Sequence, residues 1–171
     1  MPRLRDFRNY SYQASRIDRC GRDIGSKRYW KLYAIENTIR VIIHSVLNVQ
    51  IGIQWWDNAV GPTIKGRARD VRARYAGKPQ NANPGAHEIH LVFLGDLTEI
   101  IRSNSHLFTP VVPKTNQLIA TLEEIRVPRN LVGHMNFPNA FDRHAIDNAY
   151  SQLPALLQDL RSRNVPIEVP R

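Results

Sequence analysis

A long run of apolar residues at helical spacing constrains the fold of this 171-residue chain more than any other feature. The run extends from Tyr29 to about Trp56, and its apolar side chains recur every three or four residues, on one face of a helix. Such a face is stable only when other elements cover it. Its members are Leu32, Ile35, Ile39, Ile43, Val46 and Leu47.

Further stretches with a helical period follow, and none alternates as a strand hairpin would. They span residues 64–76, 88–103 and 115–127, and a last one begins at Asn139, a plausible N-cap with Asp142 in its first turn. We therefore predict an all-α protein, an antiparallel helical bundle of about four main helices with an additional short basic helix.

Proline, glycine and charge divide the chain into segments. We expect a basic N-terminal arm over residues 1–28, extended or partly helical, a helical domain over 29–163 and an irregular tail over 164–171. Residues 77–85 should form a loop. Pro128 should kink or end the helix before it near Val127, because proline lacks a backbone donor and restricts the preceding residue.

The net charge of +9 is concentrated in two segments. Residues 1–28 and residues 64–78 each carry an excess of five positive charges, which is typical of a polyanion-binding surface. A solvated surface or an acidic protein partner would produce the same pattern. The cations of the second segment that we expect to bind RNA are Lys65, Arg69 and Arg72 on one side of the helix, with Arg67 and Arg74 away from it.

Several classes of protein are disfavoured by composition. The single cysteine, Cys20, rules out an internal disulfide framework and fits a reducing compartment, and Glu36, Arg40 and His44 interrupt the most apolar stretch, so no membrane association is expected. We find no secretory signal and predict a cytoplasmic protein. No nucleotide-binding glycine motif occurs, and His87-x-x-His90 lacks a third ligand, so we expect neither a cofactor nor a metal.

The side chains best suited to chemistry lie close together near the end of residues 115–127. Arg129, Asn130 and His134 fall within six residues, and on a helical wheel Arg126, Asn130 and His134 form one stripe. Arginine supplies a planar donor for phosphate, and imidazole can transfer a proton near neutral pH. The group therefore suits phosphodiester cleavage, although basic residues at a helix end often only contact its terminal carbonyls.

A carboxylate on the apolar face of the first long helix also needs an explanation. Glu36 lies about 40° from Leu32 on the helical wheel, and burying it without a partner would be costly. Arg40, four residues later, is the favoured local partner, and an arginine of the 126–134 segment is the distant alternative. We therefore treat Glu36, Arg40 and Arg126 as residues that support the candidate site.

Three stretches of this sequence resemble the HEPN superfamily, and especially its Swt-type subgroup. Arg129-Asn130-Leu131-Val132-Gly133-His134 is similar to the family signature of an arginine, a polar residue and a histidine. Leu32–Arg40 is similar to the first long helix of these domains, and Phe93–Phe108 to the segment before the motif helix. The resemblance covers roughly Tyr29 to Arg161.

This resemblance implies a homodimer in which both motifs line one cleft, and a metal-independent endoribonuclease of toxin or antiviral-defence type. His134 would act as general acid/base, Arg129 would hold the scissile phosphate, and Asn130 would orient phosphate or His134. An antitoxin or defence-system protein would be a further partner. Some family members carry a tyrosine two residues after the histidine that an antitoxin modifies, whereas this chain has Asn136, so inhibition here would rest on contact alone.

Two other functions fit the same residues. A non-catalytic HEPN-type module would bind RNA, nucleotide or a protein partner without turnover. Binding of duplex DNA through the two basic segments ranks last, because no recognition-helix motif accompanies them.

Overall fold

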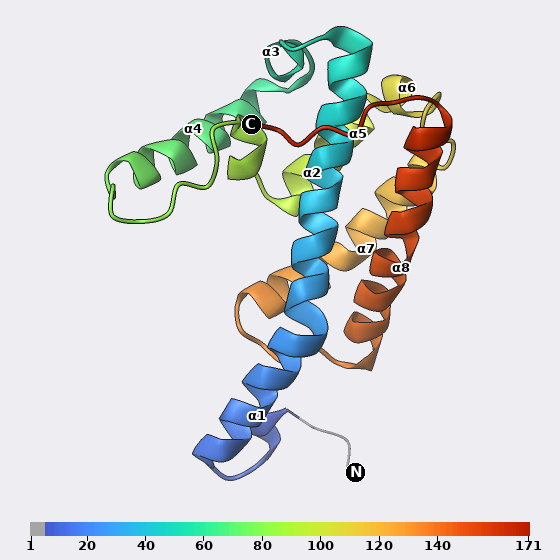
Figure 1. Ribbon diagram of the computed structural model, residues 1–171. Helices are drawn as coiled ribbons and strands as arrows, with labels where there is room; N and C mark the ends of the chain where they lie inside the picture. The colour runs from blue at the N-terminus through green and yellow to red at the C-terminus, as the bar shows by residue number, and fades with distance from the viewer. Residues whose placement is uncertain (1–5) are drawn as a thin grey trace.

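The computed structural model describes residues 6–171, and over this range the chain is all-α, without strands. Figure 1 shows the helices packed against one another around the long helix α2. The helices are α1 (Ala14–Ile24), α2 (Trp30–Ile51), α3 (Trp55–Ala59), α4 (Pro62–Ala76), α5 (Leu94–Ser103), α6 (Ser105–Phe108), α7 (Thr115–Gly133) and α8 (Ala140–Ser162), with short turns η1 (Phe7–Asn9), η2 (Gly25–Tyr29) and η3 (Glu88–Leu91).

The first long helix begins earlier and ends earlier than its apolar pattern predicted. A π-helical turn, η2, joins α1 to α2, so residues 14–51 form one continuous rod (Figure 1), and residue 28 lies inside it. The predicted extension to about Trp56 is wrong, because Gly52 adopts φ +86° and ψ −179°, which only glycine tolerates easily. The short α3 then starts at Trp55.

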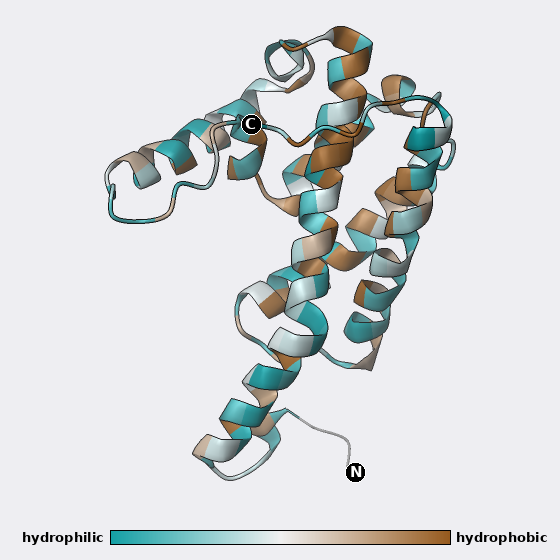
Figure 2. Ribbon diagram, in the orientation of Figure 1, coloured by the Kyte–Doolittle hydropathy of each residue, from teal (hydrophilic) through white to brown (hydrophobic). Residues whose placement is uncertain are grey.

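The core lies where α2, α5, α7 and α8 meet. All six apolar residues predicted on the face of α2 are buried, and Figure 2 shows hydrophobic colour on its inward side. α7 and α8 form an antiparallel pair because only residues 134–139 connect them. The predicted N-cap of α8 is confirmed: the Asn139 side chain accepts from the backbone N–H of Asp142, whose carboxylate accepts from that of Asn139, each at 2.9 Å.

The predicted short basic helix is confirmed as α4. It extends to the side of the bundle, and the segment after it returns as an exposed loop to η3 (Figure 1). The tail beyond α8 crosses α2 as non-helical chain: the backbone N–H of Glu168 donates to Ser45 Oγ at 2.9 Å, and His90 Nε2 lies 3.0 Å from the carbonyl of Pro170. No helix within residues 6–171 is long and apolar enough to cross a membrane.

Candidate functional site

The helix that carries Arg129 and Asn130 continues past Pro128, contrary to the prediction that it ends near Val127. Pro128 lies inside α7, which runs to Gly133, and His134 is its C-cap residue. The proline removes one backbone donor, but its ring is buried while Val127 is exposed, and packing of α7 against α5 and α8 holds the helix through this position. Met135 then turns the chain with φ +59°, so His134 lies at the corner that leads to α8.

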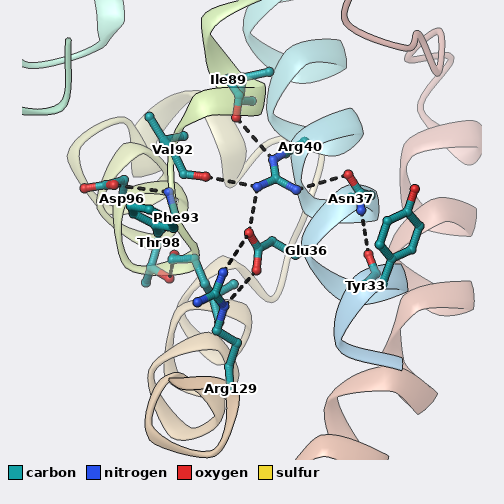
Figure 3. A network of polar contacts seen from close by, with 11 residues as sticks. Tyr33, Glu36, Asn37, Arg40, Ile89, Val92, Phe93, Asp96, Thr98 and Arg129 are labelled. Atoms are coloured by element: carbon teal, nitrogen blue, oxygen red, sulfur yellow. Dashed lines mark hydrogen bonds and ion pairs between the residues drawn. The ribbon is translucent and has the colours of Figure 1, made fainter. Parts of the chain in front are cut away.

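Glu36 joins two arginines that are far apart in the sequence. Arg40 Nη2 donates to Glu36 Oε1 at 2.6 Å, and Arg129 Nε donates to Glu36 Oε2 at 3.0 Å (Figure 3). Arg129 Nη2 also donates to Oε1, at 3.4 Å. The local partner and the distant alternative for Glu36 are therefore both present, and the carboxylate fixes the orientation of the Arg129 guanidinium from across the bundle.

Arg40 connects the Glu36 pair to the backbone of the following segment. Its Nε donates to the carbonyl of Ile89 at 3.2 Å, and its Nη2 to the carbonyl of Val92 at 3.0 Å (Figure 3). Its Nη1 donates to Asn37 Oδ1 at 3.0 Å. We call Glu36, Arg40 and Arg129 the charge network; two cations against one anion leave it one net positive charge next to solvent.

The charge network forms one wall of a cleft that encloses about 480 Å³. Glu36, Arg40 and Arg129 line it together with Tyr29, Tyr33 and His90. Within residues 6–171, Nη1 of Arg129 donates to no other group, so this corner of the guanidinium remains available to a ligand. A cleft of this size with a net positive wall suits a phosphate ester.

A second cleft, of about 590 Å³, lies beside α5 and α7 and is not lined by Arg129. Asn130 and Arg126 line it, as does Phe93, whose ring centroid lies 5.7 Å from Cζ of Arg129. Arg126 is exposed and lies 3.4 Å from a carboxylate oxygen of Glu123. Within residues 6–171, no hydrogen bond or ion pair joins Arg126 to the charge network, so its predicted supporting role stays a prediction.

His134 lies outside both clefts. Its side chain is exposed, and its imidazole makes no hydrogen bond or ring contact with residues 6–171; only its backbone is engaged, donating to the carbonyl of Asn130 at 2.9 Å. The fold therefore brings Arg129, Glu36 and Arg40 together, while Asn130 opens into the second cleft and His134 faces solvent. Within one protomer, the three motif residues therefore do not line one common cleft.

The five cations predicted to bind RNA differ in whether they already have a polar partner within the protein. Lys65 donates to the carbonyl of Asp57 at 2.7 Å, Arg67 pairs with the buried carboxylate of Asp96, and Arg72 donates to the carbonyl of Ala86 at 2.7 Å. Arg69 and Arg74 are exposed and have no such partner in the part of the chain that the structure describes.

The two histidines of the H-x-x-H pair, His87 and His90, contact different residues. His87 stacks on Trp55, with ring centroids 5.0 Å apart, and its Nδ1 accepts from the backbone N–H of Ile89 at 3.1 Å. Burial, together with the nearby His44, lowers the pKa of His87 to about 4. Within residues 6–171 no group of three His, Cys, Asp or Glu side chains is placed to hold a metal ion.

Sequence reasoning overlooked the aromatic residues around Arg129. Tyr29, Tyr33 and Phe93 lie at or beside Arg129, and each is roughly half or more exposed. The spacing of Tyr29, Tyr33 and Glu36 on one helix was a signal that pointed to a shared face, but Phe93 reaches Arg129 only through the packing of α5 on α7. No family model, curated protein or solved structure matches this chain.

Proposed function

We propose that this protein is an endoribonuclease that cleaves RNA through attack of the 2′-hydroxyl on the adjacent phosphate, without a metal cofactor. The observation that carries the proposal is the Glu36–Arg129 pair: a carboxylate on α2 orients an arginine of α7 so that one of its nitrogens stays available at a cleft. The resemblance of residues 129–134 to the HEPN signature and the net charge of +9 support the same function.

In this reaction the 2′-oxygen bonds to phosphorus as the bond to the 5′-oxygen breaks. An imidazole takes the proton from the 2′-hydroxyl, and an imidazolium gives a proton to the leaving 5′-oxygen. The products are a 2′,3′-cyclic phosphate and a 5′-hydroxyl. DNA lacks the nucleophile and is not cut.

Arg129 would hold the phosphate through Nη1 and stabilise the charge that grows on its oxygens. Glu36 and Arg40 would keep that guanidinium in place, and Asn130 would contact the phosphate or His134. Because His134 is exposed and does not line the cleft of its own protomer, we propose a homodimer whose composite cleft pairs Arg129 of one protomer with His134 of its partner. The RNA path would extend along the cations of α4, which are Lys65, Arg67, Arg69, Arg72 and Arg74. Of these, Arg69 and Arg74 have no polar partner among residues 6–171.

The test is cleavage of total RNA and tRNA in EDTA by the wild-type protein and by His134→Ala. We expect the wild-type protein to leave cyclic phosphate ends and the variant to lose at least about a hundredfold in rate, the usual scale of general acid–base catalysis. The imidazole is exposed and makes no hydrogen bond or ring contact with residues 6–171, so the variant should keep wild-type stability within about 0.5 kcal/mol. Equal cutting by both proteins would remove His134 from the reaction.

A non-catalytic binding module is the second candidate, and one observation favours it: Arg129, Asn130 and His134 do not share a cleft in one protomer. Expression discriminates the two functions. A toxin or defence nuclease should arrest growth when produced without its inhibitory partner, and His134→Ala should relieve the arrest. A binding module should be tolerated in both forms.

A further inference from the structure

Two exposed aromatic rings flank the charge network on opposite sides. Tyr33 is 67% exposed and Phe93 is 55% exposed. In Figure 3, Phe93 lies on one side of the Glu36–Arg129 pair and Tyr33, beyond Asn37, on the other; Tyr33 and Arg129 line the same cleft.

Hydrogen bonds fix the backbone from which each of these two rings projects. Tyr33 precedes Glu36 on α2 by three residues, a rise of roughly 4.5 Å, and its carbonyl accepts from Asn37 Nδ2 at 2.8 Å. Phe93 is the N-cap residue of α5, and its backbone N–H donates to Asp96 Oδ2 at 3.2 Å. The positions of both rings are therefore set by helices, although their faces remain open.

A neighbouring aromatic residue shows that these rings differ from ordinary packed ones. Trp30, on the same helix as Tyr33, meets the ring of Tyr150 edge to face, with centroids 4.9 Å apart. Within residues 6–171, Tyr33 makes no ring–ring or cation–π contact, and the one such contact of Phe93 is with the guanidinium of Arg129. An arginine plane beside an aromatic ring is an arrangement on which a nucleic-acid base can continue the stack.

We propose that Tyr33 and Phe93 are base-stacking platforms for the two nucleotides that flank a phosphate held by Arg129. Single-stranded RNA is the ligand whose chemistry fits: it alternates flat bases with anionic phosphates, and here one exposed ring contacts the Arg129 guanidinium while a second lines the same cleft as Arg129. A duplex keeps its bases stacked on one another and cannot use the rings. This inference rests on the proposed function for the role of Arg129, and it adds the parts of the substrate that are bound on each side of the cleavage point.

Binding should be measured with a labelled 2′-O-methyl oligoribonucleotide, which keeps its bases and phosphates but cannot be cleaved. We expect Tyr33→Leu and Phe93→Leu each to weaken binding about tenfold, the scale of one lost stack. Ile53→Ala is the control, because Ile53 is another exposed apolar side chain, 86% exposed, that lines neither cleft, and it should bind like wild type. An oligomer with abasic sugars should bind wild type weakly and show no difference between wild type and the two platform variants.

Two outcomes would overturn the proposal: wild-type affinity in both platform variants, or no binding of the oligomer by the wild-type protein. Cleavage of unmodified RNA, followed in parallel, separates this proposal from the nuclease. Cutting by wild type with unchanged binding in both variants would reject the platforms and keep the nuclease. Ring-dependent binding without any cutting would keep the platforms and reject the nuclease.

Discussion

At the residue scale, the partners of a buried charge are set by the fold as well as by its neighbours in the sequence. Glu36 was predicted to need a partner, and it has two, Arg40 and Arg129, on different helices. The side chains of Glu36 and Arg40 are 12% and 11% exposed, so water screens this pair only weakly. Removing one member of such a group leaves uncompensated charge, which costs more than the ion pair contributes.

Replacing Glu36 with glutamine should therefore lower the free energy of unfolding by about 3 kcal/mol. Urea unfolding measures it. The matched control is Glu124→Gln on α7, where the side chain is exposed and has no ion pair among residues 6–171, and the change should be within about 0.5 kcal/mol. Equal effects of the two substitutions would mean that the charge network contributes no more than a surface carboxylate.

His87 should make stability depend on pH in the acidic range. Its folded-state pKa is about 4, below the usual 6.5, because burial and His44 disfavour the charged ring; Glu88 opposes this shift, whereas His90 and Arg72 add to it. Between these two values the unfolded chain takes up a proton that the folded chain does not. Stability should thus fall as pH drops from 6.5 towards 4, by about 1–2 kcal/mol after allowance for partial exposure.

Urea midpoints between pH 7.5 and 4.5 test the His87 prediction. His87→Gln should be less stable at pH 7.5, since it loses the stack on Trp55, and should show a flatter pH profile. His106→Gln, at an exposed position on α6, should keep the wild-type slope. A slope unchanged by the loss of His87 would assign the acid sensitivity to other groups.

At the element scale, one glycine ended a helix against prediction, and one proline that was predicted to end a helix did not. Gly52 ends α2 through a positive φ, although the apolar pattern continues past it to Trp55 and Trp56. Pro128 fails to end α7, although local rules predict that it should. The difference is that a backbone angle outside the helical region breaks the helix by itself, whereas one missing hydrogen bond can be offset by packing on two sides.

Two alanine substitutions should therefore shift stability in opposite directions. Gly52→Ala should cost about 1–3 kcal/mol, because φ +86° with ψ −179° is strained for a residue with a Cβ. Gly66→Ala, inside α4 with open space around the added methyl group, should gain about 0.5–1 kcal/mol. Thermal unfolding of both variants provides the comparison. A stabilised Gly52→Ala would show that the positive φ is not required there.

At the scale of the whole molecule, the proposed reaction needs groups that one protomer does not bring together. Arg129 lines the cleft formed with α2, while His134 caps α7 and faces solvent. Exposed apolar side chains near the end of α7 and the start of α8 are Val127, Met135 and Phe141. Symmetric association through that region would bury them and bring a second His134 close to the first cleft.

Mixing two inactive variants tests the composite cleft. Arg129→Ala and His134→Ala should each be inactive, but heterodimers formed by refolding them together contain one intact Arg129 and one intact His134 on different protomers. We expect partial recovery of RNA cleavage, together with a species of twice the 19.7 kDa mass of one chain in sedimentation. No recovery in a proven heterodimer would place both residues of each site in the same protomer.

The sequence alone determined the class of fold. The 3.6-residue period predicted the all-α architecture, the buried face of α2, the basic helix α4 and the Asn139 cap, because each depends on residues within a few positions of one another. The same period also indicated that Glu36 faces inward and needs a partner. These properties are local, so a linear pattern is sufficient to read them.

The tertiary structure alone decided which side chains meet. Packing placed Glu36 against Arg129, which is 93 residues away, kept Arg40 between two backbone carbonyls, and separated Asn130 and His134 from the cleft that Arg129 lines. It also brought Phe93 to Arg129 and left Tyr33 exposed at the cleft that Arg129 lines. Helical spacing relates residues on one helix, whereas contacts between helices depend on how the whole core packs, and no short stretch of sequence specifies that.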